Sequence, residues 1–439
     1  MFDNKNILIM GMGVTGKSAL KFLTNYPCKI YVYDENKNLN EENIQEDFVI
    51  FNIYDLEKIN LIVKSPGIYP YHEILDKARE LGIEIISDIE LSYRFLKSEN
   101  VVAITGTNGK TTTTTLVKDI LQRQNKTFDV GNIGNGILDI TNKAAKEDYV
   151  VIEASSFQLE DTKKFKPHIA LLTYVTSDHL DWHGSVENYI NAKFKIFANQ
   201  DENDFGILNY EDRNMQNVAS IKSKKYYFST DPISEMGAFV KDGVIYYNDG
   251  MSSQPIIKTS EIKIPGEHNI KNVMGAIIIA KILGIDNEKI QQSIKLFTGV
   301  EHRIEFVREL KGVKYYNDSK GTNPDSTDVA IKAMDGNVIL IAGGYDKGAS
   351  FDTMIKNNKD KLKLLILFGQ TAPKISKVCK KEGLDFYIVK DLEKAVNLSF
   401  NFASEKDDVL FSPACASWDM YKDYEQRGRH FKNIVKELI

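Results

Sequence analysis

Short apolar, β-branched runs alternate with helical patterns along the whole chain, and this alternation constrains the fold more than any other feature. Strands are expected at residues 7–10, 30–33, 61–63 and 83–86, then at 101–105, 150–153 and 169–173, and again at 338–342, 364–368 and 409–411. Strands separated by helices usually pair in parallel and are covered by helices on both faces. We therefore predict an α/β protein built on Rossmann-like and P-loop-like parallel sheets.

The alternation divides into three blocks, in keeping with a length of 439 residues. The first block closes on a capping box, SDIE at 87–90, which predicts a helix running toward Leu96. The second block holds a helix over about 187–197 and a polar, Tyr-rich, hairpin-like region over about 226–264. We predict domains at 1–92, 93–298 and 299–439.

Composition excludes several classes of protein. Apolar residues make up 42% and charged residues 27%, as in an ordinary globular chain, and a net charge of −5 argues against a general nucleic-acid binder. The three cysteines are too few and too scattered for a disulfide framework or a cysteine-based zinc site. No run resembles a secretory signal or approaches the roughly 20 apolar residues that span a bilayer. A cytoplasmic protein without membrane insertion is expected.

The second block opens with a candidate phosphate loop, GTNGKT at 106–111, between a predicted strand and a predicted helix. Glycines in this context let backbone N–H groups surround phosphate oxygens, Lys110 reaches the terminal phosphates, and the Thr111 hydroxyl can hold Mg²⁺. Ile104 stands where the full Walker pattern has glycine. The alternative is a plain turn whose lysine is solvated.

A second glycine cluster follows the first strand and leaves three interpretations open. Gly11, Gly13 and Gly16, with Asp34 at the end of the next strand, match a dinucleotide fingerprint, which taken alone indicates an NAD-dependent oxidoreductase. The phosphate loop downstream weakens that interpretation, because a dehydrogenase needs no triphosphate. The cluster could instead hold another diphosphate, or serve only close packing of a helix.

Polar residues also follow the strands of the second block. Glu153 ends a strand beside the phosphate-loop strand, where a carboxylate can coordinate Mg²⁺. His179 follows the next strand and could ligate metal, whereas a capping or surface role is the alternative for it and more so for His183. Lys193 lies in an amphipathic helix, where most lysines are solvated.

Together these motifs resemble the Mur ligase family of peptidoglycan synthesis. The shared motifs are GTNGKT at 106–111, EASSFQL at 153–159, DH at 178–179, HNIKN at 268–272 and HR at 302–303. NDSKGTN at 317–323 and SPACASWD at 412–419, continuing to EQRG at 425–428, are similar to the branch that adds D-glutamate to UDP-N-acetylmuramoyl-L-alanine. The resemblance covers all three blocks.

The resemblance implies that the first domain binds the UDP of the muramoyl substrate and not NAD. The implied contacts are Val14, Thr15, Asp34, Glu35, Asn36, Ser65 and Gly67, with Asn132 at the muramoyl-alanine end. Glu35 and Asn36 replace a Thr-Arg pair found in well-studied members, so the uridine contacts are expected to depart from that pattern.

For ATP, the resemblance implies a site held by the second domain and the start of the third. The implied residues are Gly106, Thr107, Asn108, Gly109, Lys110, Thr111, Thr112, Asn269, Asn272, Arg303 and Asp318. Two Mg²⁺ ions are expected, with Thr111, Glu153, His179 and Lys193 at the metals, and the family's matching lysine is carbamylated. Lys110, His179 and Lys193 are the implied catalytic residues.

The third domain is expected to bind D-glutamate. The implied contacts are Lys320, Thr322, Lys347, Ser417, Trp418 and Tyr424. Trp418 replaces a smaller apolar residue of the family pattern. As alternatives, the SPACASWD segment is a loop leading to a C-terminal helix in which Trp418 and Tyr421 pack at i, i+3 spacing, and the NDSKGTN segment is a plain turn.

The implied reaction transfers the ATP γ-phosphoryl group to the alanyl carboxylate, and the amine of D-glutamate then displaces phosphate from the acyl phosphate. His179 is a candidate for accepting the amine proton, a role that substrate or phosphate oxygens could also fill. A hinge near residue 298 and a monomeric state are expected. The rival functions are a related ligase with another acceptor, such as a folate-polyglutamylating or an L-alanine-adding enzyme, and the NAD-linked oxidoreductase.

Overall fold

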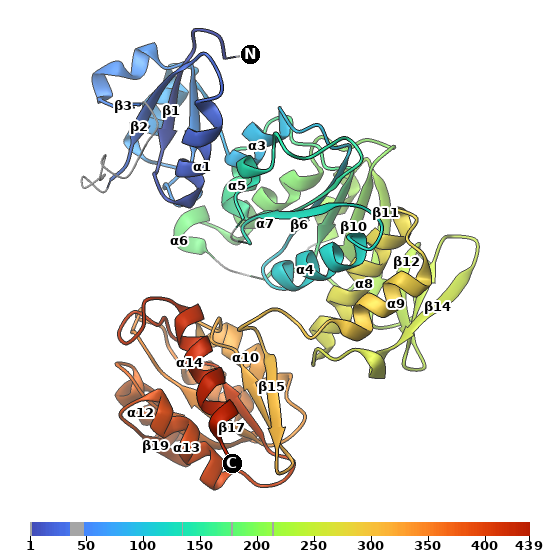
Figure 1. The fold of residues 1–439 in the computed structure, drawn as a ribbon, viewed down its shortest axis with the longest axis vertical. Coiled ribbons are helices and arrows are strands. Elements are labelled where there is room, and N and C mark those ends of the chain that lie inside the picture. Colours follow the sequence, from blue (N-terminus) through green and yellow to red (C-terminus); the bar gives the residue numbers. More distant parts are fainter. Residues whose placement is uncertain (1, 36–47, 134, 177–178, 213–214) are drawn as a thin grey trace. The chain divides into compact units, whose positions relative to one another are not determined.

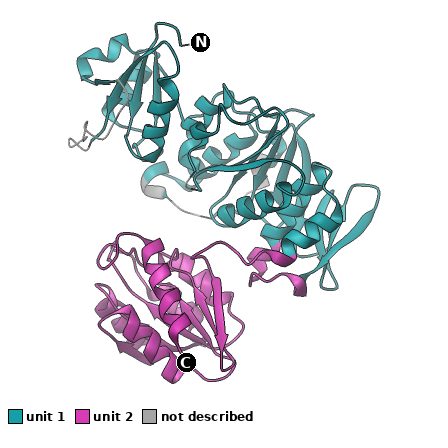
Figure 2. Cartoon of the chain, viewed as in Figure 1, with its two compact units in different colours: residues 1–259, 271–294 teal, residues 260–270, 295–439 magenta. Residues whose placement is uncertain are grey.

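The computed structural model describes residues 2–35, 48–133, 135–176, 179–212 and 215–439 (Figure 1). It contains two compact units, one of residues 1–259 with 271–294 and one of residues 260–270 with 295–439 (Figure 2). The first unit carries two sheets and the second unit carries one. Among the described helices, none is both long and apolar enough to cross a bilayer.

The first sheet is five-stranded, parallel throughout, and ordered β3-β2-β1-β4-β5. Its strands are β1 (Asn6–Met10), β2 (Lys29–Tyr33), β3 (Val49–Ile50), β4 (Leu61–Lys64) and β5 (Glu84–Ile86). The helical segments are α1 (Val14–Leu23), η2 (Ile53–Lys58), α2 (Glu73–Glu80) and α3 (Asp88–Tyr93). Leu8 and Met10 face one core while Ile7 and Ile9 face another, so β1 is buried on both sides. The predicted strands of this block are confirmed, and β3 is an addition.

The predicted capping box at residues 87–90 forms only in part. The Ser87 side chain accepts the Glu90 N–H, but Glu90 does not reciprocate. One oxygen of Glu90 instead accepts the N–H groups of Lys163, Lys164 and Phe165. The helix ends at Tyr93, short of Leu96.

The second sheet has nine strands in the order β14-β13-β12-β11-β10-β9-β6-β8-β7. They are β6 (Asn100–Thr105), β7 (Thr127–Gly131), β8 (Tyr149–Glu153), β9 (Ile169–Leu172), β10 (Phe205–Asn209), β11 (Lys224–Ser229), β12 (Gly237–Lys241), β13 (Val244–Asn248) and β14 (Ser253–Lys258). The seven strands from β7 to β12 in the sheet order, β6 included, pair in parallel with one another. Strands β12, β13 and β14 form an antiparallel meander. The meander confirms the hairpin-like region.

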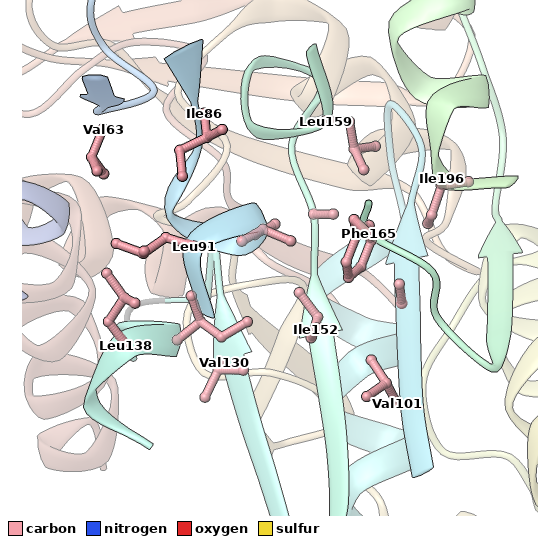
Figure 3. Packing of buried hydrophobic residues seen from close by; sticks show 14 of the residues in the cluster. Val63, Ile86, Leu91, Val101, Val130, Leu138, Ile152, Leu159, Phe165 and Ile196 are labelled. Carbon is pink, nitrogen blue, oxygen red and sulfur yellow. The ribbon is translucent and has the colours of Figure 1, made fainter. Parts of the chain in front are cut away.

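Helical segments lie between several strands of the second sheet and follow its last strand. The helical segments are α4 (Lys110–Leu121), η3 (Ile137–Asp139), α5 (Ser156–Glu160), α6 (Leu180–His183), α7 (Val186–Phe194), η4 (Lys195–Phe197), η5 (Met215–Ser220), η6 (Thr259–Glu261), α8 (Glu267–Ile282) and α9 (Asn287–Leu296). Figure 3 shows Val63 and Ile86 of the first sheet in the same apolar cluster as Ile152 and Leu159, which belong to β8 and α5. The two sheets of the first unit therefore share one core.

The third sheet is ordered β15-β16-β20-β17-β18-β19, with only the edge strand β15 antiparallel. Its strands are β15 (Glu305–Leu310), β16 (Val313–Asn317), β17 (Val338–Ala342), β18 (Leu362–Leu367), β19 (Phe386–Ile388) and β20 (Asp408–Phe411). The helices are α10 (Pro324–Lys332), α11 (Asp352–Asn358), α12 (Ala372–Glu382), α13 (Leu392–Phe402) and α14 (Tyr424–Glu437). Helices α10, α11 and α12 pack on one face and α13 and α14 on the other, which is the predicted doubly covered arrangement.

Candidate functional site

The loop at residues 106–109 joins the end of β6 to the start of α4 and requires its two glycines. A Cβ on Gly106 (φ +148°) would lie 1.9 Å from Thr173 Oγ1, and one on Gly109 (φ +84°) would lie 2.3 Å from Asn272 Oδ1. Lys110 folds back over this loop, where Nζ donates to the carbonyl of Gly106 at 2.8 Å and to that of Thr107 at 2.9 Å. The strand, loop, helix and lysine of a phosphate site are therefore assembled.

The run of threonines at 111–115 starts α4 without interrupting it. The hydroxyls of Thr113 and Thr115 each donate at 2.9 Å to a carbonyl four residues earlier. Thr111 and Thr112 are buried at the helix start. This places two hydroxyl groups beside the phosphate loop.

Glu153 ends β8, the strand next to β6, and its carboxylate is 1% exposed. Asn132 Nδ2 donates to Glu153 Oε1 at 2.9 Å. Glu153 Oε2 is buried without a hydrogen-bond partner among the described residues. A buried carboxylate oxygen in that state is a suitable ligand for a cation such as Mg²⁺.

The described residues include no group of three or more His, Cys, Asp or Glu side chains placed to hold a metal ion. Mg²⁺ in nucleotide sites often binds one or two protein oxygens, with phosphates and water completing its shell. Glu153 together with the Thr111 hydroxyl fits that requirement.

Lys193 is buried at 2% exposure, so the expectation that it is solvated is wrong. Its Nζ donates to the Gly106 carbonyl at 2.9 Å and lies 4.5 Å from the centre of the Tyr189 ring. The hydroxyl oxygens of Tyr189 and Thr107 lie 3.0 Å apart. A helix distant in sequence thus delivers an amine to the phosphate loop.

Two histidines flank Phe157 of α5. His179 is exposed, has a left-handed backbone (φ +51°), and its ring centre lies 4.9 Å from that of Phe157. His183 is buried, stacks on Phe157 at 5.5 Å, and its Nε2 lies 3.0 Å from Ser156 Oγ. His183 is therefore a buried residue and not the surface histidine that was its alternative, whereas the role of His179 remains a prediction. Asp178, which precedes it, lies outside the described residues.

The three glycines after β1 do not share one role. A Cβ on Gly16 would lie 1.9 Å from the Gly11 carbonyl oxygen, and one on Gly11 would lie 2.9 Å from Ser65 Cβ. At Gly13, no atom of the described residues lies within 4 Å of the same position. Gly11 and Gly16 therefore serve close packing, while Gly13 borders open space.

The remaining predicted UDP contacts lie around the same loop. Asp34 Oδ2 accepts the Met12 N–H at 2.5 Å, and Ser65 Oγ donates to the Gly11 carbonyl at 2.8 Å. Thr15 is half-buried, and Val14, Glu35 and Gly67 are exposed. Asn36 lies outside the described residues.

In the second unit, the predicted D-glutamate residues follow the carboxyl ends of β16, β17 and β20. Ser417 is buried, Thr322 is half-buried and Lys347 is exposed. Lys320 Nζ lies 5.8 Å from the ring centre of Tyr424, the first residue of α14. Ligands in such sheets bind at this edge.

Trp418 precedes α14 and is not part of it, so the i, i+3 pairing of Trp418 and Tyr421 on that helix is wrong. Its side chain is 65% exposed, and its ring centre lies 5.5 Å from that of Tyr345. The Tyr345 N–H donates to the Ala416 carbonyl at 3.0 Å. Trp418 therefore belongs to the loop cluster at the sheet edge.

Arg427 holds two of these loops together; it lies in the EQRG motif at 425–428, but the sequence assigned it no role of its own. It is 1% exposed and donates to Ser319 Oγ and to the carbonyls of Ser319, Cys415 and Ala416 at 2.8–3.1 Å. Burial lowers the pKa of its guanidinium to about 10. One sequence signal could have indicated its burial. Arg427 lies four residues before Phe431, on the face of α14 that carries the buried apolar residues.

Asp318 lies under the same loops and is 4% exposed. It accepts a hydrogen bond from Ser412 Oγ at 2.6 Å and another from the Ile304 N–H at 3.2 Å. Burial raises the pKa of this carboxyl group to about 7, although the charges of Arg303 and Arg427 oppose the rise. Arg303 itself is half-buried.

The predicted adenine residues are both buried in α8. Asn269 Nδ2 donates to the Pro265 carbonyl at 2.7 Å. Asn272 lies against Gly109 of the phosphate loop. Within the first unit, the structure therefore brings together Lys110, Thr111, Asn132, Glu153, Lys193 and Asn272 around one loop.

Family models match the chain in three consecutive stretches. A MurD-like N-terminal domain of Mur ligases matches residues 5–87, the Mur ligase middle domain matches 104–280, and a Mur ligase glutamate ligase domain matches 302–415.

Curated relatives match over nearly the full length. The UDP-N-acetylmuramoylalanine--D-glutamate ligase of Thermoanaerobacter sp. (strain X514) is 44% identical over 99% of this chain and 98% of its own length. The protein of the same name from Caldicellulosiruptor bescii is 43% identical with the same coverage.

Solved structures share the fold at low identity. MurC of Thermotoga maritima has a TM-score of 0.59 at 18% identity and covers 98% of this chain and 99% of its own. A pseudomurein peptide ligase of type C from Methanothermus fervidus has a TM-score of 0.60 at 17% identity and covers 99% and 100%. These likenesses establish the three-sheet α/β architecture.

Proposed function

The chain belongs to the Mur ligase family, and we infer that it joins D-glutamate to UDP-N-acetylmuramoyl-L-alanine in an ATP-dependent reaction of peptidoglycan synthesis. The enzyme is an amide-bond-forming ligase that yields ADP and phosphate. The structural observation that carries the nucleotide chemistry is the loop at 106–109, with Lys110 folded over it. On the neighbouring strand lies Glu153, whose buried Oε2 accepts no hydrogen bond from any described residue.

The first step must bring two anions together. Two unit charges about 4 Å apart repel by roughly 4 kcal/mol at an effective dielectric constant of 20. The Lys110 ammonium and the N–H groups of the phosphate loop offset this repulsion and orient the γ-phosphoryl group toward the alanyl carboxylate. The carboxylate oxygen forms a bond to phosphorus, the bond to ADP breaks, and an acyl phosphate results.

Two Mg²⁺ ions are proposed beside the triphosphate, where they would supply positive charge to the phosphate oxygens. Glu153 and Thr111 would hold the first ion, and His179 would approach the second. Lys193 is the residue whose carbamylation would convert its amine into a metal-binding carboxylate group, in keeping with the family pattern. Its burial beside Gly106 supports this assignment.

Around Gly13, we assign the UDP moiety to Val14, Thr15, Asp34, Glu35, Ser65 and Gly67, and the muramoyl-alanine end to Asn132. The open space beside Gly13 supports a diphosphate ligand over a purely structural glycine cluster. The nucleotide's adenosine is assigned to Asn269, Asn272, Arg303 and Asp318.

For D-glutamate, we assign the α-carboxylate to Lys347 and Thr322 and the side-chain carboxylate to Ser417 and the backbone near Tyr424. Cationic and hydroxyl donors on opposite sides of one pocket select a dicarboxylic amino acid. Its neutral amine attacks the acyl carbon, the amide bond forms, phosphate departs with the acyl oxygen, and the amine proton passes to His179 or to a substrate or phosphate oxygen. The protein is proposed to act as a cytoplasmic monomer with domains at 1–92, 93–298 and 299–439.

Phosphate release tests this assignment. Purified protein is incubated with ATP, Mg²⁺ and UDP-N-acetylmuramoyl-L-alanine, and individual amino acids are added in turn. We expect release with D-glutamate and not with L-alanine, L-glutamate or D-aspartate. Release with L-alanine on the precursor that lacks alanine would refute the acceptor assignment. Tight NADH binding without ATP dependence would favour an oxidoreductase instead.

Lys110→Ala separates the two ligands in the same assay. Phosphate release should fall at least a thousandfold, because the variant loses the cation at the transferred phosphoryl group. Binding of the UDP substrate should remain nearly unchanged, since its UDP moiety and ATP are assigned to different sheets. Joint loss of both would contradict this division of roles.

A further inference from the structure

Lys64 is a buried lysine at the carboxyl end of β4, and none of the roles assigned above uses it. It is 2% exposed, and it precedes the 65–67 segment assigned to the UDP substrate. Its Nζ donates to the carbonyl of Ile68 at 3.3 Å. The Ile68 N–H in turn donates to the Ser65 carbonyl at 3.1 Å. The lysine therefore spans this turn and fixes its far end.

The same ammonium reaches the second sheet of the unit. Lys64 Nζ forms an ion pair with Asp161 Oδ2 at 3.0 Å, and the Asp161 side chain is 13% exposed. Asp161 directly follows the last residue of α5. A cation at this end of a helix is also favoured by the helix dipole. One buried charge thus connects the substrate turn to α5.

Helix α5 is itself anchored by buried polar groups. Gln158 completes a capping box with Ser155 and donates from Nε2 to both oxygens of Asp88 at 3.1 and 3.2 Å. Burial raises the pKa of Asp88, and the charge of Lys64 counteracts that rise. Only Ala154 and Ser155 separate this helix from Glu153. The anchor therefore extends to the strand end that carries the candidate Mg²⁺ ligand.

Aromatic rings cover the ion pair. Lys64 Nζ lies 5.5 Å from the ring centre of Trp182, whose ring is 4.6 Å from Phe157 of α5 and 5.6 Å from Tyr69. Tyr69 follows the turn that Lys64 holds. A lysine over an indole face is attracted more strongly where water is excluded, so the burial of Lys64 strengthens this contact. Figure 3 shows the adjoining apolar cluster, which contains both Val63, the residue before Lys64, and Leu159 of α5.

We propose that Lys64 is a positioning residue for the UDP substrate: through the Ile68 carbonyl, Asp161 and Trp182 it holds the turn at 65–68 against α5, so that the substrate's diphosphate is bound in a fixed geometry and its alanyl carboxylate is directed toward the phosphate loop. The proposal rests on the proposed function for the identity of the substrate. It adds a residue that touches neither ATP nor the reacting carboxylate.

Lys64→Met keeps the length of the side chain and removes its charge and donors. The KM for UDP-N-acetylmuramoyl-L-alanine should rise about tenfold, the loss expected for one hydrogen bond that involves a charged group. The KM values for ATP and D-glutamate should change less than twofold. Lys58→Met is the matched control, because Lys58 belongs to the same sheet's domain, pairs with Asp55 at 2.6 Å and has a side chain that is 62% exposed.

A second variant separates positioning from stability. Removing one partner of a buried ion pair destabilises a protein, whereas replacing both with apolar residues is often tolerated. Lys64→Met/Asp161→Leu should therefore restore the Tm that Lys64→Met lowers. It should retain the raised KM for the UDP substrate, because the bond to the Ile68 carbonyl is still missing. Recovery of both quantities would show a structural role only and overturn the proposal.

Binding can also be followed without catalysis. The chain has two tryptophans, so Trp418→Phe leaves Trp182 as the only one and makes its emission a reporter of the cluster. Titration with UDP-N-acetylmuramoyl-L-alanine should change this emission, with a Kd about tenfold higher when Lys64→Met is added. An equal Kd would overturn the proposal. Wild-type protein that binds this substrate without releasing phosphate would count against the proposed reaction, and the comparison of Kd values would still test Lys64.

Discussion

Asn132 donates from Nδ2 to Oε1 of Glu153 over 2.9 Å and thereby leaves the buried Oε2 as the available oxygen of that carboxylate. The two residues lie on the 131–133 segment after β7 and at the end of β8, which are adjacent strands. The amide fixes the orientation of the carboxylate in advance. Because the carboxylate is already held in place, less conformational entropy is lost when a cation binds to it.

Asn132→Leu should weaken Mg²⁺ binding because the Glu153 carboxylate loses its orienting donor. The Mg²⁺ concentration for half-maximal phosphate release should rise about tenfold or more at saturating UDP substrate. Asn135→Ala is the control, since the exposed Asn135 side chain donates to the Asp129 carbonyl in the same loop. An unchanged Mg²⁺ dependence in Asn132→Leu would separate Glu153 from the metal.

The glycines after β1 should respond differently to a single added methyl group. Gly16→Ala places Cβ 1.9 Å from a backbone oxygen and should lower the stability by about 1–3 kcal/mol. Gly13→Ala meets no atom within 4 Å at φ −67°, so its Tm should match the wild type while its KM for the UDP substrate rises. Thermal unfolding and substrate titration of both variants check this. The reverse pattern would mean that no ligand occupies the space beside Gly13.

Arg427→Met should affect D-glutamate selectively. The variant leaves the carbonyls of Ser319 and Cys415 without this donor, at a cost of about 1–3 kcal/mol for each buried unpaired group, while the Ala416 carbonyl keeps the Tyr345 N–H. The loops that carry Thr322 and Ser417 then lose their common anchor, so the KM for D-glutamate should rise at least tenfold. Steady-state kinetics for each substrate provide the measurement.

Arg429→Met is the control for that experiment, because Arg429 is exposed on the same helix and pairs only with Glu425 at 3.4 Å. It should leave all three KM values unchanged. If Arg427→Met raised the KM for the UDP substrate as much as that for D-glutamate, the assignment of these loops would be wrong.

Asp318 should make the stability depend on pH near neutrality. Burial raises the folded-state pKa to about 7, above the unfolded value near 3.8, so the folded state binds the extra proton between those values. The stabilising contribution of the protonated form is therefore fully present below the unfolded pKa and is lost as pH rises through about 7. Asp318→Asn removes this titration.

The Tm of Asp318→Asn relative to the wild type should accordingly increase by about 2–4 °C between pH 6 and pH 8, since one pKa unit corresponds to about 1.4 kcal/mol. Thermal unfolding at both pH values measures it. A difference that stays constant would show that Asp318 remains ionised throughout, held so by Arg303 and Ser412.

The sequence predicted those parts of the fold that local patterns specify. The central strands are short, continuous apolar runs, and the loop at 106–109 is set by its own glycines. Edge strands were missed because they are partly exposed to solvent and so contain charged residues among the apolar ones. Strand β15, for example, has the sequence EFVREL and lies half exposed at the sheet edge. Strand β10 was missed because Gly206 interrupts a short apolar run.

The sequence predicted those site residues that belong to a motif with recognisable chemistry. It did not predict residues whose role depends on being buried by distant parts of the chain. Lys110 stands in a recognisable pattern. Lys193 was assigned to the site only through the family resemblance, whereas Lys64 and Arg427 received no role. All three look like solvated cations in the sequence, and long-range packing buries them. The contact of Lys193 with Gly106 spans 87 residues, and the bond of Arg427 to Ser319 spans 108. No local periodicity encodes such pairs.

The transfer of an alanyl carboxylate oxygen to phosphate tests the central claim most directly. UDP-N-acetylmuramoyl-L-alanine labelled with ¹⁸O in both carboxylate oxygens is incubated with ATP, Mg²⁺ and D-glutamate, and the released phosphate is analysed by mass spectrometry. Activation as an acyl phosphate predicts one ¹⁸O atom in each phosphate and one in the new amide. Phosphate without ¹⁸O, released together with the amide product, would contradict the account.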